Sequence, residues 1–325
     1  MKNIISYIVS ILFLLLIMIG LINFFGKKNY NSISNKENKI QIVATLFPEY
    51  DFAKHIAGDK ADVKLLLNSG VEAHNYEPSA KDMIDILNSD MFLYIGNDLE
   101  PWTESIVHNL NETNSKVVNV AKNIELMKIE DFEEKYINFE ILEDEEHHDE
   151  HGEEIYDEHI WMNPKNAIIM IDNILEELCN IDKENAEYYK SNAKSYKAEI
   201  EEVDNKFRNL IENAERKEIA VGGEFAYAYF VDHYNLKFVS VYKNCGEGED
   251  PSIAKVKSVI DYINKYNMPA VYYEELSEGT VAKMIAEETN AEALVLYSIH
   301  NGDVKNDSYI SLMRKNLENL EKGLR

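Results

Sequence analysis

Short apolar segments that alternate with helical stretches constrain the fold of this chain more than any other feature. Each segment is four to eight residues long and is bounded by a turn or by a helical pattern. Such segments are typical of buried strands in a mainly parallel sheet whose faces are covered by helices. The eight segments are Ile40–Phe47, Val63–Leu67, Met91–Ile95, Lys116–Val120, Glu218–Val221, Phe238–Tyr242, Ala270–Tyr273 and Ala293–Leu296. The sequence therefore predicts an α/β fold with mainly parallel sheets.

A helical region from Pro164 to Arg216 separates the first four segments from the last four. Within it, apolar residues recur at alternating steps of four and three, which is the spacing of one helix face. The stripe consists of Tyr189, Ala193, Tyr196, Ile200, Val203, Phe207, Leu210 and Ala214. It lasts barely four heptads, so we expect a helix packed along the protein body and not a coiled coil. The sequence thus predicts two lobes joined by one long rigid α-helix.

The N-terminus carries an uncharged run from Ile4 to Phe25, flanked by Lys2 and by Lys27 and Lys28. A helix of 22 residues is roughly 33 Å long, enough to cross the hydrocarbon core of a membrane. The run lacks the small residues of a signal-peptide cleavage site, and no Cys follows it for a lipid anchor. We therefore expect an uncleaved signal anchor.

These patterns divide the chain into five expected parts. They are the anchor at 1–25, a polar tether at 26–38, a first lobe at 39–164, a linking helical region at 165–216 and a second lobe at 217–325. The first lobe includes an acidic loop at 143–158, which holds ten carboxylates and no Lys or Arg, a composition typical of a solvated insertion.

The net charge of −26 excludes one class of function. Nucleic-acid binding needs a basic footprint, which this composition does not supply. Acidity is compatible with attracting cations, although it also serves solubility.

Two histidines stand in loops where a metal ligand could be held. His74 follows the second predicted strand, and His159 lies directly before the linking helical region. His, Glu and Asp are the side chains that best bind zinc or manganese. Ligands of open α/β sheets bind beyond the carboxyl ends of the strands, so we expect the site in the cleft between the lobes.

At these residues the sequence resembles the substrate-binding proteins of zinc and manganese ABC transporters, the TroA-like group. Val71–Pro78 is similar to the family segment G-x-x-P-H-x-Y-E-P, with Ala73 in place of its Pro, and Asp157–Pro164 resembles D-P-H-x-W-L-D-P. The resemblance spans Ile40 to Leu324. It implies two lobes, a rigid connecting helix and a metal ion held in the cleft.

The resemblance also implies ligands in the second lobe. In Gly222–Phe230, Glu224 falls at the position where the family has a His or a Glu. At the fourth position, where many members have Asp, this chain has Tyr297, a poor ligand because the pKa of a phenol is near 10. His300 is the better donor, and Glu274, Glu275 and Tyr297 remain candidate second-shell or reserve ligands. The expected set is therefore His74, His159, Glu224 and His300.

His147, His148 and His151 lie in the acidic loop. Related zinc-binding members carry similar loops, so this one is expected to be a secondary, weaker collecting site.

The sequence predicts binding and not catalysis. We expect a monomeric, extracytoplasmic protein that captures Zn²⁺, or alternatively Mn²⁺, and delivers it to the permease and ATPase of an ABC importer. The histidines favour zinc, while Glu224 favours manganese. A metal-dependent hydrolase and a surface adhesin on the same fold are the alternatives. Against a hydrolase, the sequence has no H-E-x-x-H motif.

Overall fold

A computed structural model describes residues 39–71, 73, 76–96, 99–110, 115–136, 155–242 and 251–325. The predicted signal anchor and tether, residues 1–38, lie outside these ranges, as does most of the acidic loop. Within the described ranges, no helix has the length and apolar character needed to cross a membrane.

The first lobe is built on a parallel sheet of four strands in the order β2-β1-β3-β4. Its buried strands are rich in apolar side chains, as expected for a sheet covered on both faces. The strands are β1 (Ile40–Ala44), β2 (Ala61–Leu65), β3 (Met91–Tyr94) and β4 (Lys116–Asn119). The helices of this lobe are α2 (Phe47–Ala57), α3 (Ala80–Leu87) and α4 (Thr103–Leu110). The next helix, α5 (Ile129–Tyr136), packs through Phe132 and Tyr136 against Phe238 of the second lobe.

The second lobe repeats this arrangement with a parallel sheet in the order β6-β5-β7-β8. Its strands are β5 (Glu218–Val221), β6 (Lys237–Ser240), β7 (Ala270–Tyr273) and β8 (Glu292–Val295). Its helices are α8 (Ala228–Tyr234), α9 (Ile253–Tyr266), α10 (Thr280–Glu287) and the C-terminal α11 (Tyr309–Leu324). The prediction of two lobes with mainly parallel sheets is confirmed.

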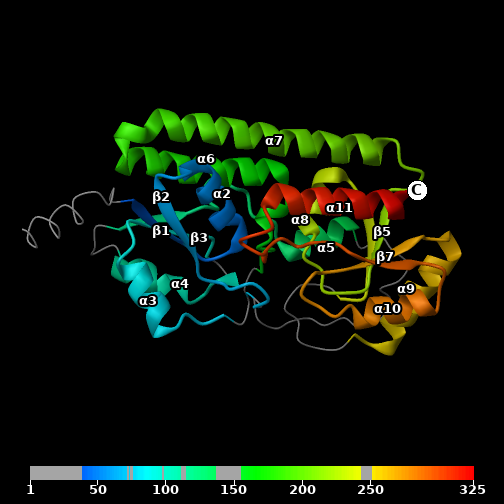
Figure 1. Ribbon diagram of the computed structural model, residues 1–325. Coiled ribbons are helices and arrows are strands. Elements are labelled where there is room, and N and C mark those ends of the chain that lie inside the picture. Colours follow the sequence, from blue (N-terminus) through cyan, green and yellow to red (C-terminus); the bar gives the residue numbers. More distant parts are fainter. Residues whose placement is uncertain are drawn as a thin grey trace, which may run out of the picture. The chain divides into compact units, whose positions relative to one another are not determined.

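The linking region differs from the prediction in one respect, because it contains two helices. α6 (Pro164–Ile181) and α7 (Ala186–Glu212) pack against each other and are joined by a short 3-10 turn, η3 (Lys183–Asn185). The chain reverses where the Asp182 carboxylate accepts hydrogen bonds from the Asn185 N–H (3.2 Å) and the Tyr189 hydroxyl (2.6 Å). α7, with 27 residues and a length of roughly 40 Å, is the long helix that spans both lobes (Figure 1).

The predicted apolar stripe of α7 is buried against the protein body. It consists of Tyr189, Ala193, Tyr196, Ile200, Val203, Phe207 and Ile211. The predicted last members, Leu210 and Ala214, are only half-buried, and Ile211 replaces them. A single apolar cluster includes this stripe and reaches from Ile42 in β1 to Leu324 at the end of α11. The lobes therefore share their largest core cluster, while two smaller clusters each lie within one lobe.

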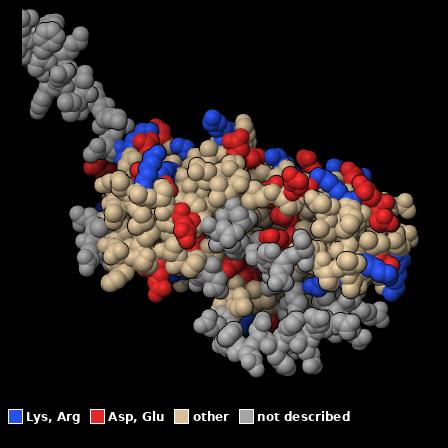
Figure 2. Space-filling model, turned by 90° about the horizontal axis from the view of Figure 1, so that it is seen from below, with Lys and Arg blue, Asp and Glu red and all other residues tan. Residues whose placement is uncertain are grey.

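Figure 2 shows the surface from below the view of Figure 1, with acidic and basic side chains interspersed on the described part of that face. There is no broad basic patch among the described residues of this face, which agrees with the net charge of −26.

Two buried carboxyl groups lie at the carboxyl edge of the first sheet. Glu49 Oε2 accepts hydrogen bonds from the Thr45 hydroxyl (2.7 Å) and from the N–H groups of Thr45 and Leu46 (both 3.1 Å). Glu100 Oε2 accepts from the N–H groups of Ile95 (2.8 Å) and Gly96 (3.0 Å). Burial raises the pKa of both groups, and the negative charge of Glu100 raises that of Glu49 further.

The raised pKa of Glu49 predicts that the stability of the folded chain depends on pH. Because the pKa of Glu49 is raised in the folded chain, the unfolded chain loses its proton first as pH rises above about 4.5. Stability contributed by protonated Glu49 is therefore fully present below that pH and is lost as pH rises toward the folded pKa. We expect Glu49→Gln, which keeps an acceptor oxygen and cannot ionise, to gain free energy of unfolding relative to the wild type as pH rises.

Urea unfolding at a series of pH values measures this difference. Glu201→Gln, on the exposed face of α7, removes the same charge without touching the pair and serves as the control. A difference between Glu49→Gln and wild type that stays constant from pH 4.5 to 8 would contradict the prediction.

Candidate metal-binding site

The predicted ligands come from loops at the carboxyl ends of strands. Glu224 follows β5, Glu274 and Glu275 follow β7, and His300 follows β8, while His159 begins the 3-10 turn η2 (Ile160–Met162). In the first sheet the chain passes from β1 to β2 on one side and from β3 to β4 on the other, and β5 and β7 behave in the same way in the second sheet. Open α/β sheets bind ligands at the carboxyl edge between two such strands.

His159 and His300 face each other at the centre of the site. Both are 2% exposed, and their ring centroids are 6.2 Å apart with an interplanar angle of 60°. Two imidazoles on one tetrahedral zinc ion, with Zn–N bonds of about 2.0 Å, have centroids roughly 5 to 6 Å apart. The structure therefore brings together one predicted ligand from each half of the chain.

A neighbouring carboxylate and a tryptophan hold His159 in place. Asp157 Oδ1 accepts a hydrogen bond from the His159 N–H (2.9 Å) and lies 3.3 Å from Nδ1 of the ring. The Trp161 ring packs edge-on at 5.4 Å between centroids, and its Nε1–H donates to the Ser298 carbonyl (2.7 Å). A carboxylate beside Nδ1 of a histidine orients the ring so that Nε2 can bind a metal.

His300 is oriented by a relay through a serine. The Ser298 hydroxyl lies 2.7 Å from His300 Nδ1 and within 3.2 Å of both Glu275 carboxylate oxygens. Because a carboxylate only accepts, the hydroxyl donates its hydrogen to Glu275 and accepts the hydrogen of Nδ1. This assignment places the lone pair of the imidazole on Nε2, which makes that nitrogen the one that can bind a metal.

Backbone strain occurs beside His300. Ile299 has φ = 65°, in the left-handed region where a β-branched side chain is strongly disfavoured, at a cost of about 1–2 kcal/mol. Glu275 supports this conformation by accepting hydrogen bonds from the N–H groups of Ser298 (2.7 Å) and Ile299 (3.1 Å). Strain that the surroundings maintain in this way is typical of functional sites.

The contacts of Ser298 predict that loss of its hydroxyl group weakens zinc binding. Ser298→Ala should lower zinc affinity about 10- to 100-fold, because the imidazole loses the partner that fixes its tautomer and orientation. Competition titration against a chromogenic chelator measures the change. Ser195→Ala, on the exposed face of α7, is the matched control. An affinity equal to that of the wild type would show that the relay does not orient a ligand.

Glu224 and Glu274 lie close to each other in the second lobe. Glu274 is 6% exposed, and its Oε2 accepts no hydrogen bond from the described residues. Burial raises the pKa of this carboxyl, and the charges of Glu224 and Glu275 raise it further. A Cβ at Gly223 would lie 2.1 Å from Glu274 Oε2, so only glycine leaves room for this carboxylate. A bound cation would offset the repulsion within this group.

Tyr297 is held against α11. Its N–H donates to Asn316 Oδ1 (2.6 Å), its carbonyl accepts from Asn316 Nδ2 (2.8 Å), and Lys315 Nζ lies over its ring at 5.2 Å. The backbone of Tyr297 is thus fixed to α11, and the Lys315 ammonium packs on its ring.

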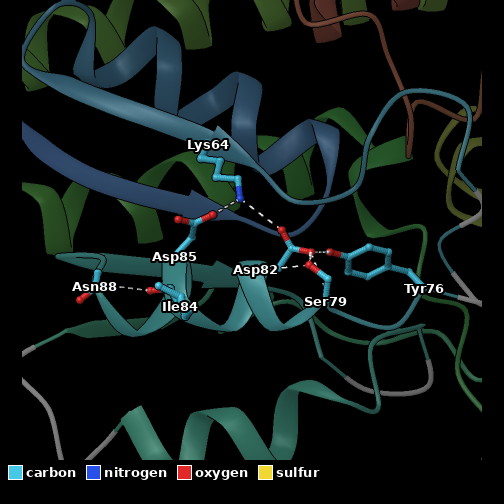
Figure 3. A network of polar contacts seen from close by, with 7 residues as sticks. All are labelled: Lys64, Tyr76, Ser79, Asp82, Ile84, Asp85 and Asn88. Carbon is cyan, nitrogen blue, oxygen red and sulfur yellow. Dashed lines mark hydrogen bonds and ion pairs between the residues drawn. The ribbon is translucent and has the colours of Figure 1, made fainter.

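His74 lies outside the described residues, and so do His147, His148 and His151. The structure does describe the network that follows His74 in the chain (Figure 3). Asp82 in α3 accepts hydrogen bonds from the hydroxyls of Tyr76 (3.2 Å) and Ser79 (2.7 Å) and from the Ser79 N–H (3.1 Å). Lys64 in β2 forms ion pairs with Asp82 and Asp85. Although burial opposes it, the bonds from Ser79 and Lys64 hold the pKa of Asp82 below its usual value.

Among the described residues, no three His, Cys, Asp or Glu side chains are grouped closely enough to hold a metal ion. Since His74 is not one of them, the predicted set of four ligands stays a prediction. Sequence reasoning did not single out Ser298 or the role of Asp157, although a hydroxyl or carboxylate two residues before a candidate histidine is a usable signal.

Comparisons with known proteins agree with this geometry. The family model described as "Zinc-uptake complex component A periplasmic" (ZnuA) matches residues 42–323. The high-affinity zinc uptake system protein ZnuA of Bacillus subtilis is 30% identical over 322 residues, which cover 98% of this chain and 96% of that protein. The zinc-binding lipoprotein AdcA of Streptococcus pneumoniae is 29% identical over 289 residues, 88% of this chain but only 56% of AdcA.

A solved structure gives the same result for the fold. The Zn(II)-bound ZnuA-like domain of Streptococcus pneumoniae AdcA has a TM-score of 0.70 and 26% identity, and the match covers 88% of this chain and 99% of that one. The sequence match, the paired four-stranded sheets and the two facing histidines lead to one assignment: the chain belongs to the ZnuA family of metal-binding proteins.

Proposed function

We propose that this protein is the extracytoplasmic substrate-binding component of an ABC importer for zinc. It captures the ion in the cleft between the lobes with His74, His159, Glu224 and His300, and it delivers the ion to a permease and its ATPase. The observation that carries this proposal is the pair of buried imidazoles, His159 and His300, which meet at 6.2 Å from separate halves of the chain. Family membership and the zinc-binding relatives support it.

Zinc is favoured over manganese by the donor atoms of the site. At least two of the proposed ligands are imidazoles held in a fixed tautomer or orientation, a donor type that suits zinc. Glu224 supplies an oxygen donor, which both metals accept. By the Irving–Williams order, zinc binds such a set more tightly than manganese.

The proposed role is binding without catalysis. Four protein ligands close the coordination sphere of a tetrahedral zinc ion and leave no position for a reactive water molecule. A metal-dependent hydrolase would need that open position, and it would show metal-dependent turnover. The adhesin alternative has no specific observation in its favour.

We further propose that the chain works as a monomer at the outer face of the cytoplasmic membrane. Residues 4–25 are long and apolar enough to act as its anchor. The loop at 143–158, with His147, His148 and His151, would then be a secondary site that collects metal weakly.

Competitive loading tests the proposal. The chain is exposed to equimolar Zn²⁺ and Mn²⁺, dialysed, and its metal content is measured by elemental analysis. We expect one tightly held zinc ion and no manganese, in the full chain and in a variant that lacks residues 143–154. Loss of tight zinc binding on this deletion alone, or tight retention of manganese, would refute the proposed cleft site for zinc.

A further inference from the structure

The segment that carries His300 also binds the turn at Gly70 and Val71 in the first lobe. Asn301 Oδ1 accepts a hydrogen bond from the Gly70 N–H (2.9 Å), and Asn301 Nδ2 donates to the Val71 carbonyl (2.8 Å). One amide side chain thus pairs with two successive backbone groups, 231 and 230 residues away in the sequence. Asn301 is 4% exposed, so these bonds are shielded from competing water.

The gripped backbone belongs to a tight turn. The Val71 N–H donates to the Asn68 carbonyl (3.1 Å), and Gly70 has φ = 84°, a conformation that glycine adopts without strain. This turn follows β2 directly, and His74 stands three residues after Val71 in the sequence. The far end of the same loop is fixed by the Tyr76–Asp82–Lys64 network. The residues on either side of His74 in the sequence are therefore fixed, Gly70 and Val71 by the second lobe and Tyr76 within the first.

On the other side, Asn301 is joined to a rigid segment. It directly follows His300, whose ring and backbone are fixed by Ser298 and Glu275. Gly302 packs against the Phe47 ring of the first lobe, where a Cβ would lie 2.6 Å from Cζ. Because Asn301 is the residue after His300 and is hydrogen-bonded to Gly70 and Val71, a movement of the His300 segment would strain or break these two bonds.

We propose that Asn301 is a positioning residue that latches the turn at Gly70 and Val71 to the His300 segment and so sets the rate at which the bound metal ion is released. The inference rests on the proposed function of the cleft. Dissociation requires ligands of both lobes to separate, and separation breaks both hydrogen bonds of Asn301. The latch therefore slows release and leaves the encounter with the ion unchanged.

Two substitutions separate the two hydrogen bonds. Asn301→Ala removes both, and we expect zinc dissociation to be about 10- to 100-fold faster with an unchanged association rate. Asn301→Asp keeps the acceptor for Gly70 but sets a carboxylate oxygen against the Val71 carbonyl, so its dissociation should also be faster than that of the wild type. Asn306→Ala is the matched control, because Asn306 is in the same segment and pairs with Asp303.

Stopped-flow mixing of the zinc-loaded full chain with excess chelator measures release, and hydrogen exchange of the Gly70 amide reports on the latch itself. Faster exchange at Gly70 together with faster release supports the proposal. A wild-type release rate in Asn301→Ala with one zinc ion bound would overturn the latch and leave the proposed function intact. Failure of the wild type to load zinc would overturn both. If Asn301→Ala does not fold, Asn301→Asp gives the same comparison at nearly equal side-chain volume.

Discussion

Replacing His300 or His159 by alanine is expected to lower zinc affinity more than about 100-fold. Removing a partner that merely orients a zinc ligand costs about 10- to 100-fold, so removing the ligand itself should cost more. Both rings are buried at the point where the lobes meet, and each substitution removes one of the two imidazoles that face each other there. Competition titration with a chelator of known affinity measures the loss.

His108→Ala is the control for this experiment. His108 is an exposed residue of α4, so its loss removes an imidazole without touching the cleft. Thermal unfolding of the metal-free variants should show that they fold. Zinc affinity within threefold of the wild type in both His159→Ala and His300→Ala would mean that the metal binds elsewhere.

Phe207→Ala is expected to lower the free energy of unfolding by about 3–5 kcal/mol. The side chain is fully buried in the stripe of α7 and packs edge-on against Phe230 (5.3 Å between centroids) and close to Tyr234 (5.3 Å) in α8. Truncation removes the buried ring and leaves a cavity that the rigid surroundings cannot fill. Urea unfolding monitored by circular dichroism gives the value.

Glu201→Ala provides the comparison on the same helix. This residue lies on the exposed face of α7, where substitutions change stability by no more than about 0.5 kcal/mol. Equal effects of the two substitutions would contradict the conclusion that the α7 stripe is part of the core.

The strands could be predicted from sequence because their apolar runs are local. β5 and β7 occupy the predicted residues, and the others begin or end within a few residues of the prediction. β1 ends at Ala44 and not at Phe47, because Glu49 Oε2 binds the N–H groups of Thr45 and Leu46 and so starts α2 early. A side-chain contact of this kind decides a boundary that periodicity leaves open.

The break between α6 and α7 is a second boundary that periodicity could not predict. Apolar spacing alone does not distinguish one helix from two packed helices, and the interruption depends on the contacts of Asp182 with Asn185 and Tyr189. The sequence did contain an indication of two helices, because the apolar stripe begins only at Tyr189 and not at Pro164.

The histidines of the site could be singled out from their loops and motifs, but their supporting contacts could not. Ser298, Glu275 and His300 are joined through a turn with a strained Ile299, which no local pattern predicts. Asn301 pairs with residues about 230 positions earlier, a relation that only the folded chain reveals.

The shared core has a consequence for how the chain can be divided. Its largest apolar cluster runs from Ile42 to Leu324 through α7, so dividing the chain would expose apolar surface that each half buries against the other. The two lobes should melt together in one cooperative transition, and a fragment ending in the linking region should not fold by itself. A ligand that both halves contribute to would then raise the midpoint of that single transition, so the cargo stabilises the entire carrier and not one lobe.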